Sequence, residues 1–124
     1  MQDAKNLIVA ERAQKVAMLI YRLTADFPPA ERFGLTSQMR RAAVSVGSNI
    51  SEGCGRRSNR ELLHFLFIAM GSASELQYQC NLARGLVFGD PAALDAAARE
   101  IDRLKAMLSR LITALRRQPA RRPV

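Results

Sequence analysis

Glu61 and His64 are the residues whose types and spacing come nearest to a metal site. Glu-x-x-His is the motif that binds metal in di-iron four-helix bundles, but such sites need a second copy of it and glutamates from two other helices. His64 is the only histidine in the chain. A metal site would therefore have to be shared between subunits. We expect Glu61 to cap a helix instead, and we predict no metal ligand and no cofactor.

Cys54 lies between two glycines, a position that would suit a nucleophile. The sequence supplies no evident base for it, because the single histidine would have to serve and nothing orients that histidine. The segment is not a phosphate loop either, since it lacks the G-x-x-x-x-G-K-[ST] pattern. Cys54 and Cys80 form no C-x-x-C pair and are interpreted as small apolar residues. We predict no catalytic residues, and a cytoplasmic protein that is not an enzyme.

Two polar stripes have the spacing of a helix face. They consist of Arg41, Ser45, Asn49 and Glu52, and of Ser72, Glu75 and Gln79. A polar stripe beside an apolar seam can hold a ligand, or it can form hydrogen-bonded pairs that fix helix register. We favour a structural network, such as Arg41 with Glu75 or Glu52, within a subunit or across an interface.

Arginine dominates the charge of the chain. There are 19 basic and 11 acidic residues, and the net charge is +8. Fixed positive charge favours polyanions because it displaces counterions from phosphates. The candidate nucleic-acid-binding residues are Arg40, Arg41, Arg56, Arg57 and Arg60, and at the C-terminus Arg116, Arg117, Arg121 and Arg122. We expect the second connector and the C-terminus at opposite ends of the fold, so that these arginines make two separate patches.

No aromatic residue interleaves with these arginines in the sequence. Stacking of unpaired bases would then lack its usual platform. We expect RNA or DNA to be held through phosphates with little sequence preference. The alternative is that the arginines form only a solvated surface.

The first two helices carry apolar residues at helical spacing. The first is predicted from a cap at Asp3 to the Phe27-Pro28-Pro29 break, with a stripe of Leu7, Ile8, Val16, Leu19, Ile20 and Leu23. The second is predicted from a cap at Thr36 or Ser37 to Gly53-Cys54-Gly55, with a heptad-like seam of Met39, Ala43, Val46, Ile50 and Gly53.

The last two helices begin with clear capping patterns. Ser58 and Glu61 fit a capping box, and Asp90 before Pro91 places a cap and a first helical residue. We expect the third helix to reach about Arg84 and the turn after it to close one end of the fold. The fourth helix has a seam of Leu94, Ala97, Ile101, Leu104, Leu108, Leu111 and Leu115.

These four amphipathic helices with short connectors predict an all-α, antiparallel up-down-up-down four-helix bundle. No strand pattern appears. The bundle is predicted over residues 1–118, followed by a basic disordered tail over residues 119–124. No run of eighteen apolar residues occurs, so we expect no contact with a membrane.

A longer pattern links the second and third helices. It reads R-R-A-x-x-S-x-x-S-N-I-x-E-G from Arg40 to Gly53, and G-S-A-x-E-L from Gly71 to Leu76. The pattern resembles the 23S rRNA-intervening-sequence proteins, a family that includes relatives of the accessory variability determinant of diversity-generating retroelements. Val87-Phe88-Gly89 departs from the family's usual pattern.

The resemblance implies a four-helix bundle that assembles as a ring, typically a homopentamer. It also implies a positively charged surface, through which the accessory variability determinant binds nucleic acid and a reverse transcriptase. No catalytic role is implied for the matched residues, which are Arg40, Arg41, Ser45, Ser48, Asn49, Glu52, Gly53, Arg56, Arg57, Ser58, Gly71, Glu75 and Gln79.

Three hypotheses follow from the sequence. The first is a non-enzymatic homo-oligomer that binds RNA or DNA electrostatically as an accessory factor. The second is an oligomeric scaffold that docks an acidic protein or a nucleic-acid enzyme such as a reverse transcriptase. The third is a metal site between subunits at Glu61 and His64.

Overall fold

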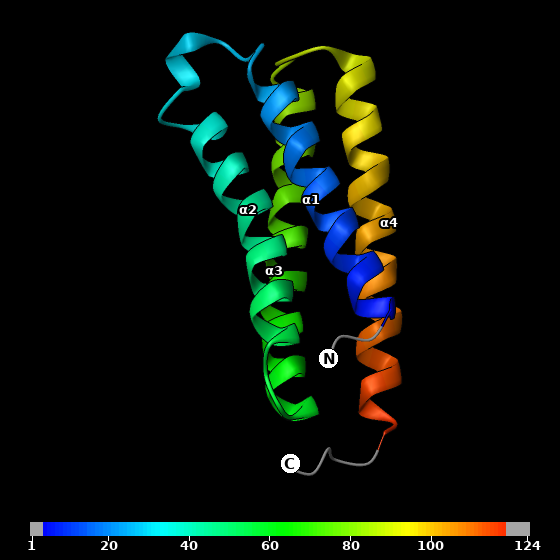
Figure 1. Ribbon diagram of the computed structural model, residues 1–124. Helices are drawn as coiled ribbons and strands as arrows, with labels where there is room; N and C mark the ends of the chain where they lie inside the picture. Colours follow the sequence, from blue (N-terminus) through cyan, green and yellow to red (C-terminus); the bar gives the residue numbers. More distant parts are fainter. Residues whose placement is uncertain (1–3, 119–124) are drawn as a thin grey trace.

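The computed structural model describes residues 4–118 as four long helices joined by three connectors (Figure 1). The helices are α1 (Ala4–Thr24), α2 (Leu35–Cys54), α3 (Asn59–Gly85) and α4 (Pro91–Arg116), with a short 3-10 helix, η1 (Pro29–Glu31), in the first connector. The predicted tail over 119–124 and the predicted cap at Asp3 lie outside the described residues.

The helices form an antiparallel bundle in which each helix packs against two neighbours. The packed pairs are α1 with α2, α2 with α3, α3 with α4, and α4 with α1. The chain direction alternates, so the connectors over 25–34 and 86–90 lie at one end and the α2–α3 turn lies at the other (Figure 1). This confirms the predicted four-helix bundle. None of the helices within residues 4–118 is long and apolar enough to cross a membrane.

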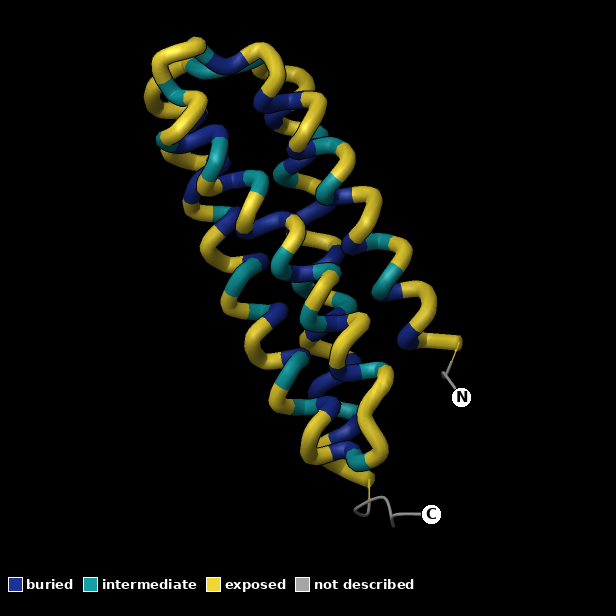
Figure 2. Tube along the Cα trace, turned by 60° about the vertical axis from the view of Figure 1, so that its left-hand side comes forward, coloured by how far each residue is buried: buried dark blue, intermediate teal, exposed yellow. Residues whose placement is uncertain are grey.

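The buried side chains recur on the inner side of each helix (Figure 2). All seven predicted seam positions of α4 and all five of α2 are buried. The prediction was wrong at the start of α1, where Leu7 and Ile8 are each 50% exposed and Asn6 and Val9 point inward. Steps of three and four residues back from Val16 lead to Ala13, Val9 and Asn6, so the inner stripe continues without Leu7 or Ile8.

The helix starts follow the capping prediction in two of three places. Ser58 Oγ accepts from the Glu61 N–H at 3.1 Å, and Asp90 Oδ2 accepts from the Ala93 N–H at 3.0 Å. The cap predicted at Thr36 or Ser37 was wrong, because α2 already begins at Leu35. The carboxylate of Glu31 reaches forward from η1 and accepts from the Leu35 N–H at 3.1 Å, so a side chain four residues earlier satisfies the free donor.

The turn after α3 closes one end of the bundle through Phe88. Its ring packs at a tilt on Phe27 with 5.7 Å between centroids, whereas Val87 is 82% exposed. Gly89 has a φ of 75°, and a Cβ there would lie 2.9 Å from the Phe27 ring. Glycine is therefore required at this position both for its backbone and for the space it leaves.

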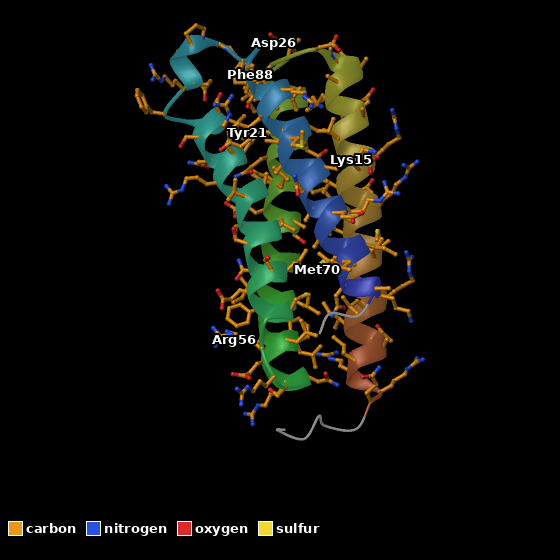
Figure 3. The ribbon with its side chains drawn as sticks, viewed as in Figure 1. Lys15, Tyr21, Asp26, Arg56, Met70 and Phe88 are labelled. Atoms are coloured by element: carbon orange, nitrogen blue, oxygen red, sulfur yellow. The ribbon has the colours of Figure 1, made fainter. Side chains whose placement is uncertain are left out.

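Glu100 connects α4 to α1 by ion pairs near the middle of the bundle. Its carboxylate contacts Lys15 Nζ at 3.1 Å and Arg12 Nη1 at 3.5 Å, and it pairs within α4 with Arg103 at 3.4 Å. Figure 3 shows Lys15 on the side of α1 that faces α4. The hydrogen bond from Lys15, helped by the charges of all three cations, lowers the pKa of Glu100 below its ordinary value of 4.5, although partial desolvation opposes this.

We predict that Leu104→Arg destabilises the whole bundle. Leu104 is 1% exposed, and an unpaired charge in its place costs about 3–5 kcal/mol of unfolding free energy. The measurement is thermal unfolding followed by circular dichroism. Ala106→Arg, at an exposed position two residues later, is the control and should melt close to the wild type. An unchanged melting temperature for Leu104→Arg would contradict the assigned core.

A second prediction concerns acid. A carboxyl with a lowered pKa stabilises the fold above its unfolded-state pKa, and this contribution disappears as the pH falls through the folded-state value. Glu100→Gln should therefore cost about 1 kcal/mol near pH 7, and the gap to the wild type should close as the pH falls from 4.5 through the lower folded-state pKa of Glu100. Urea unfolding at several pH values measures both effects. Glu11→Gln, exposed on α1, is the control; a gap that stayed constant with pH would contradict the assignment.

Candidate nucleic-acid interface

The two arginine clusters lie at the same end of the bundle. The α2–α3 turn and the last turn of α4 are adjacent at the lower end in Figure 1, and Asn59 Nδ2 donates to Gln118 Oε1 at 3.2 Å between them. The prediction of opposite ends was wrong, because the second and fourth helices of an up-down bundle run in the same direction. We call the resulting surface the arginine end; it consists of Arg56, Arg57, Arg60, Arg116 and Arg117.

The arginine end carries little compensating negative charge. Glu52 accepts from Arg56 Nη2 at 2.9 Å, and Glu61 accepts from the hydroxyl of Ser58 at 3.2 Å. Within residues 4–118, none of the other four arginines forms an ion pair with a carboxylate, and all five are exposed. Figure 3 shows Arg56 projecting from this end, far from Asp26 and Phe88 at the opposite one. The surface therefore has a strong positive potential.

Close packing of α2 on α3 brings an aromatic ring beneath one of these arginines. A Cβ at Gly53 would lie 2.9 Å from the Cβ of Phe65, so only glycine permits this approach. Arg56 then lies over the Phe65 ring, with its Cζ 5.0 Å from the centroid. The imidazole of His64 packs edge-on against the same ring, with 5.2 Å between the ring centroids.

A second ring, Phe67, lies under Arg116 of α4. The guanidinium Cζ is 4.9 Å from the ring centroid, a cation–π distance, and Phe67 remains 45% exposed. We expected base stacking to lack a platform because no aromatic residue interleaves with the arginines in the sequence; the fold instead brings Phe65 and Phe67 beneath Arg56 and Arg116. Arg60 and Phe67 are seven residues apart, which is two helical turns, so the periodicity of α3 could have predicted that they share a face.

A surface hollow of about 460 Å³ opens between the start of α3 and the end of α4. It is lined by Asn59, Arg60, Leu63, His64, Phe67, Leu115, Arg116 and Gln118. None of these described lining residues is acidic. Asn59 is only 5% exposed, and its Oδ1 has no hydrogen-bond partner among the described residues. The hollow thus combines a floor of apolar and aromatic side chains, two arginines, and a buried amide oxygen that accepts no hydrogen bond from the described residues.

The remaining basic candidates lie elsewhere. Arg40 caps the end of α1, where it donates to Thr24 Oγ1 at 2.9 Å and to the Tyr21 carbonyl at 3.2 Å, and its guanidinium lies over the Tyr21 ring. Arg41 faces the α2–α3 groove, about four turns from Arg56. Arg121 and Arg122 lie outside the described residues. Arg40 therefore serves helix packing, and the arginine end is formed by the other five.

The two polar stripes face each other along the α2–α3 groove. Ser45 and Ser72 share a hydrogen bond of 2.9 Å between the helices, and Asn49 donates to the Ser45 carbonyl at 2.9 Å. Gln79 donates to Glu75 at 3.4 Å within α3.

No ion pair among residues 4–118 joins Arg41 to Glu75 or to Glu52. Arg41 and Glu75 line the same hollow of about 360 Å³, together with Ser45 and Ser72. Glu52 is bound instead to Arg56. The bond between Ser45 and Ser72 thus joins the two helices, Asn49 bonds within α2, and the charged side chains of Arg41 and Glu75 are exposed.

The residues considered as metal ligands or nucleophiles are Glu61, His64 and the two cysteines. Within residues 4–118, no three His, Cys, Asp or Glu side chains lie close enough to hold a metal ion. A site shared between subunits at Glu61 and His64 stays a prediction. Both cysteines are free, and burial raises the pKa of the Cys54 thiol and raises that of Cys80 to about 11. A raised pKa lowers the thiolate fraction and with it the nucleophilicity.

Comparison with known proteins gives one family match. The family model described as 23S rRNA-intervening sequence protein matches residues 5–110. This range takes in all of α2 and α3 and most of α1 and α4. No curated protein matches the sequence significantly.

A solved structure has the same fold. It is a protein of unknown function from the S23 ribosomal protein family of Bacteroides thetaiotaomicron, with a TM-score of 0.78 and 20% sequence identity. The alignment covers 88% of this chain and 98% of the other. At this identity the likeness shows the shared four-helix fold and nothing about the ligand.

Proposed function

We infer a nucleic-acid-binding function for this chain, which belongs to the family of 23S rRNA-intervening sequence proteins. The proposed protein is a homo-oligomeric accessory factor that holds RNA or DNA through phosphate contacts at the arginine end. The single observation that carries this proposal is that the α2–α3 turn and the end of α4 gather five exposed arginines, of which only Arg56 is paired with a carboxylate of residues 4–118.

The arrangement favours phosphate over an isolated small anion. The guanidinium groups come from two separate helix ends, so they can contact several phosphates of one strand or duplex at once. Each contact releases condensed counterions, which makes the affinity fall steeply with salt. The bundle supplies a rigid base for these flexible side chains.

We propose that the protein acts by binding and not by catalysis. Both thiols have raised pKa values, and His64 packs against Phe65 with no carboxylate hydrogen-bonded to it among residues 4–118. Free thiols suit a reducing compartment, so we place its action in the cytoplasm.

We predict that Arg56→Glu with Arg57→Glu weakens binding to structured RNA and to duplex DNA by tenfold or more near 100 mM salt. The reason is that two cations no longer bind phosphate and two new carboxylates repel it. The salt slope should fall by about 1 for each phosphate that the variant no longer binds. Fluorescence anisotropy at several salt concentrations measures both, and circular dichroism checks the fold.

The control is Arg32→Glu with Arg99→Glu, which changes the net charge equally at exposed positions away from the arginine end. Equal losses of affinity in the two double variants would mean that binding follows net charge and not this surface. If the wild type bound no nucleic acid even at low salt, the proposal would be wrong, and an acidic protein such as a reverse transcriptase would become the favoured partner.

An exposed apolar stripe supports the proposed self-association. Ile68, Tyr78 and Leu82 are 40%, 66% and 40% exposed, and their spacing places them on one outward stripe of α3. Val44, on the neighbouring α2, is 45% exposed. A stripe of this kind favours contact with another protein surface. We propose that it packs against further copies of this chain, in the ring of five that the family resemblance implies.

We predict that the wild type elutes as an oligomer of the 13.7 kDa chain and that Tyr78→Glu shifts it toward the monomer. A buried charge at the centre of the stripe would lack a partner in the interface. Size-exclusion chromatography with light scattering gives the mass. Phe33→Glu, at an 87% exposed position in the first connector, is the control. A monomeric wild type would contradict the self-association proposal and leave the arginine-end proposal standing.

A further inference from the structure

We propose that the hollow between α3 and α4 at the arginine end binds an unpaired nucleotide of a single-stranded nucleic acid, with its base stacked on Phe67 and its phosphate held by Arg60 and Arg116. This inference rests on the proposed nucleic-acid-binding function and goes beyond it, because it gives the protein a means to distinguish unpaired from paired nucleotides.

The floor of the hollow suits the flat, apolar face of a base. Leu63, Phe67 and Leu115 line it, and the Phe67 ring is 45% exposed. Stacking on an aromatic ring is available to every base, since every base has a π-face. In a duplex these faces are occupied by neighbouring base pairs, so only an unpaired or terminal nucleotide can use the floor.

The walls of the hollow suit the phosphate. Arg60 comes from the first turn of α3 and Arg116 from the last turn of α4. None of the described residues that line the hollow is acidic, so none of them competes with a phosphate for the two guanidinium groups. The guanidinium of Arg116 has no hydrogen bond or ion pair within the described residues, and its Cζ lies 4.9 Å from the centroid of the Phe67 ring. A base can therefore take the place of the guanidinium on the ring, while the guanidinium moves onto the adjoining phosphate.

The amide groups of the hollow supply polar recognition. Asn59 and Gln118 are bonded to each other through Nδ2 and Oε1 at 3.2 Å, and Asn59 Oδ1 is left without a partner at a 5% exposed residue. A buried acceptor without a donor is uncommon and costs free energy. An exocyclic amino group of a base is a donor of the kind that this oxygen lacks, and it reaches the buried oxygen once the Asn59 side chain turns toward the hollow.

The test compares a labelled single-stranded oligonucleotide that does not pair with itself and the duplex that it forms with its complementary strand. Phe67→Leu keeps an apolar side chain but removes the ring, and it should weaken single-strand binding about tenfold, with little change for the duplex. The salt slope should stay unchanged, because the arginines still hold the same phosphates. Phe67→Trp should restore the single-strand affinity.

The matched control is Phe33→Leu at the opposite end of the bundle. Phe33 also lies under an arginine, with Arg32 Cζ 5.3 Å from its centroid, but it is not part of the hollow. This variant should bind both oligonucleotides as the wild type does. Circular dichroism should show the same helical content in all variants, since neither ring belongs to the buried core.

The outcomes separate the two proposals. An equal decrease in affinity for single strand and duplex in Phe67→Leu, or no decrease at all, would overturn the nucleotide pocket, while the arginine-end proposal would stand if Arg56→Glu with Arg57→Glu still abolished binding. For the arginine-end proposal the criterion is the predicted weakening by the double variant of tenfold or more. A wild type that binds neither oligonucleotide at low salt would overturn both proposals. A lower affinity of Phe67→Leu for the single strand alone, with rescue by tryptophan, is the expected result.

Discussion

The alternation of chain direction between packed helices decides which residues of this protein can act together. Connectors over 25–34, 55–58 and 86–90 are short, so each helix must return along the one before it. The ends of α2 and α4 consequently lie at the same end of the bundle, although they are some sixty residues apart in the sequence. Both are helix C-termini, where partial negative charge from the backbone stabilises cations. The arginines there contribute to the helix ends as well as to the surface they form.

Small residues set the distance at which the functional side chains meet. Gly53 lets α3 approach so closely that Phe65 lies against it and beneath Arg56. Farther along the groove, a hydrogen bond of 2.9 Å between the hydroxyl oxygens of Ser45 and Ser72 joins the same two helices. The α2–α3 pair is thus closely packed, and it fixes Phe65 relative to Arg56.

Periodicity predicted the fold because the spacing of apolar residues along one helix shows which of its faces is buried. The seams of α2 and α4 and the caps at Ser58 and Asp90 could be recognised one helix at a time. The arginine end could not be found in that way, since it depends on the relative direction of two helices. The contact of Arg116 with Phe67 and the cap that Glu31 gives to Leu35 join residues whose relation is visible only once the chain is folded.

The core of the bundle is less completely buried toward the end of α4 than in its middle, because the last turns of α4 lie beyond the described part of α1. Lys5, Ile8 and Val9 lie beside Met107, Arg110 and Leu111, so the last turns of α4 extend past the beginning of α1 (Figure 1). Leu111, Ile112 and Leu115 accordingly keep 7–9% exposure, whereas Ile101, Leu104 and Leu108 have at most 1%. Local opening of these turns costs less free energy than opening the middle of α4. At the arginine end the last turns of α4 are therefore the part of that helix that opens most easily, whereas Phe27 and Phe88 pack together at the opposite end of the bundle.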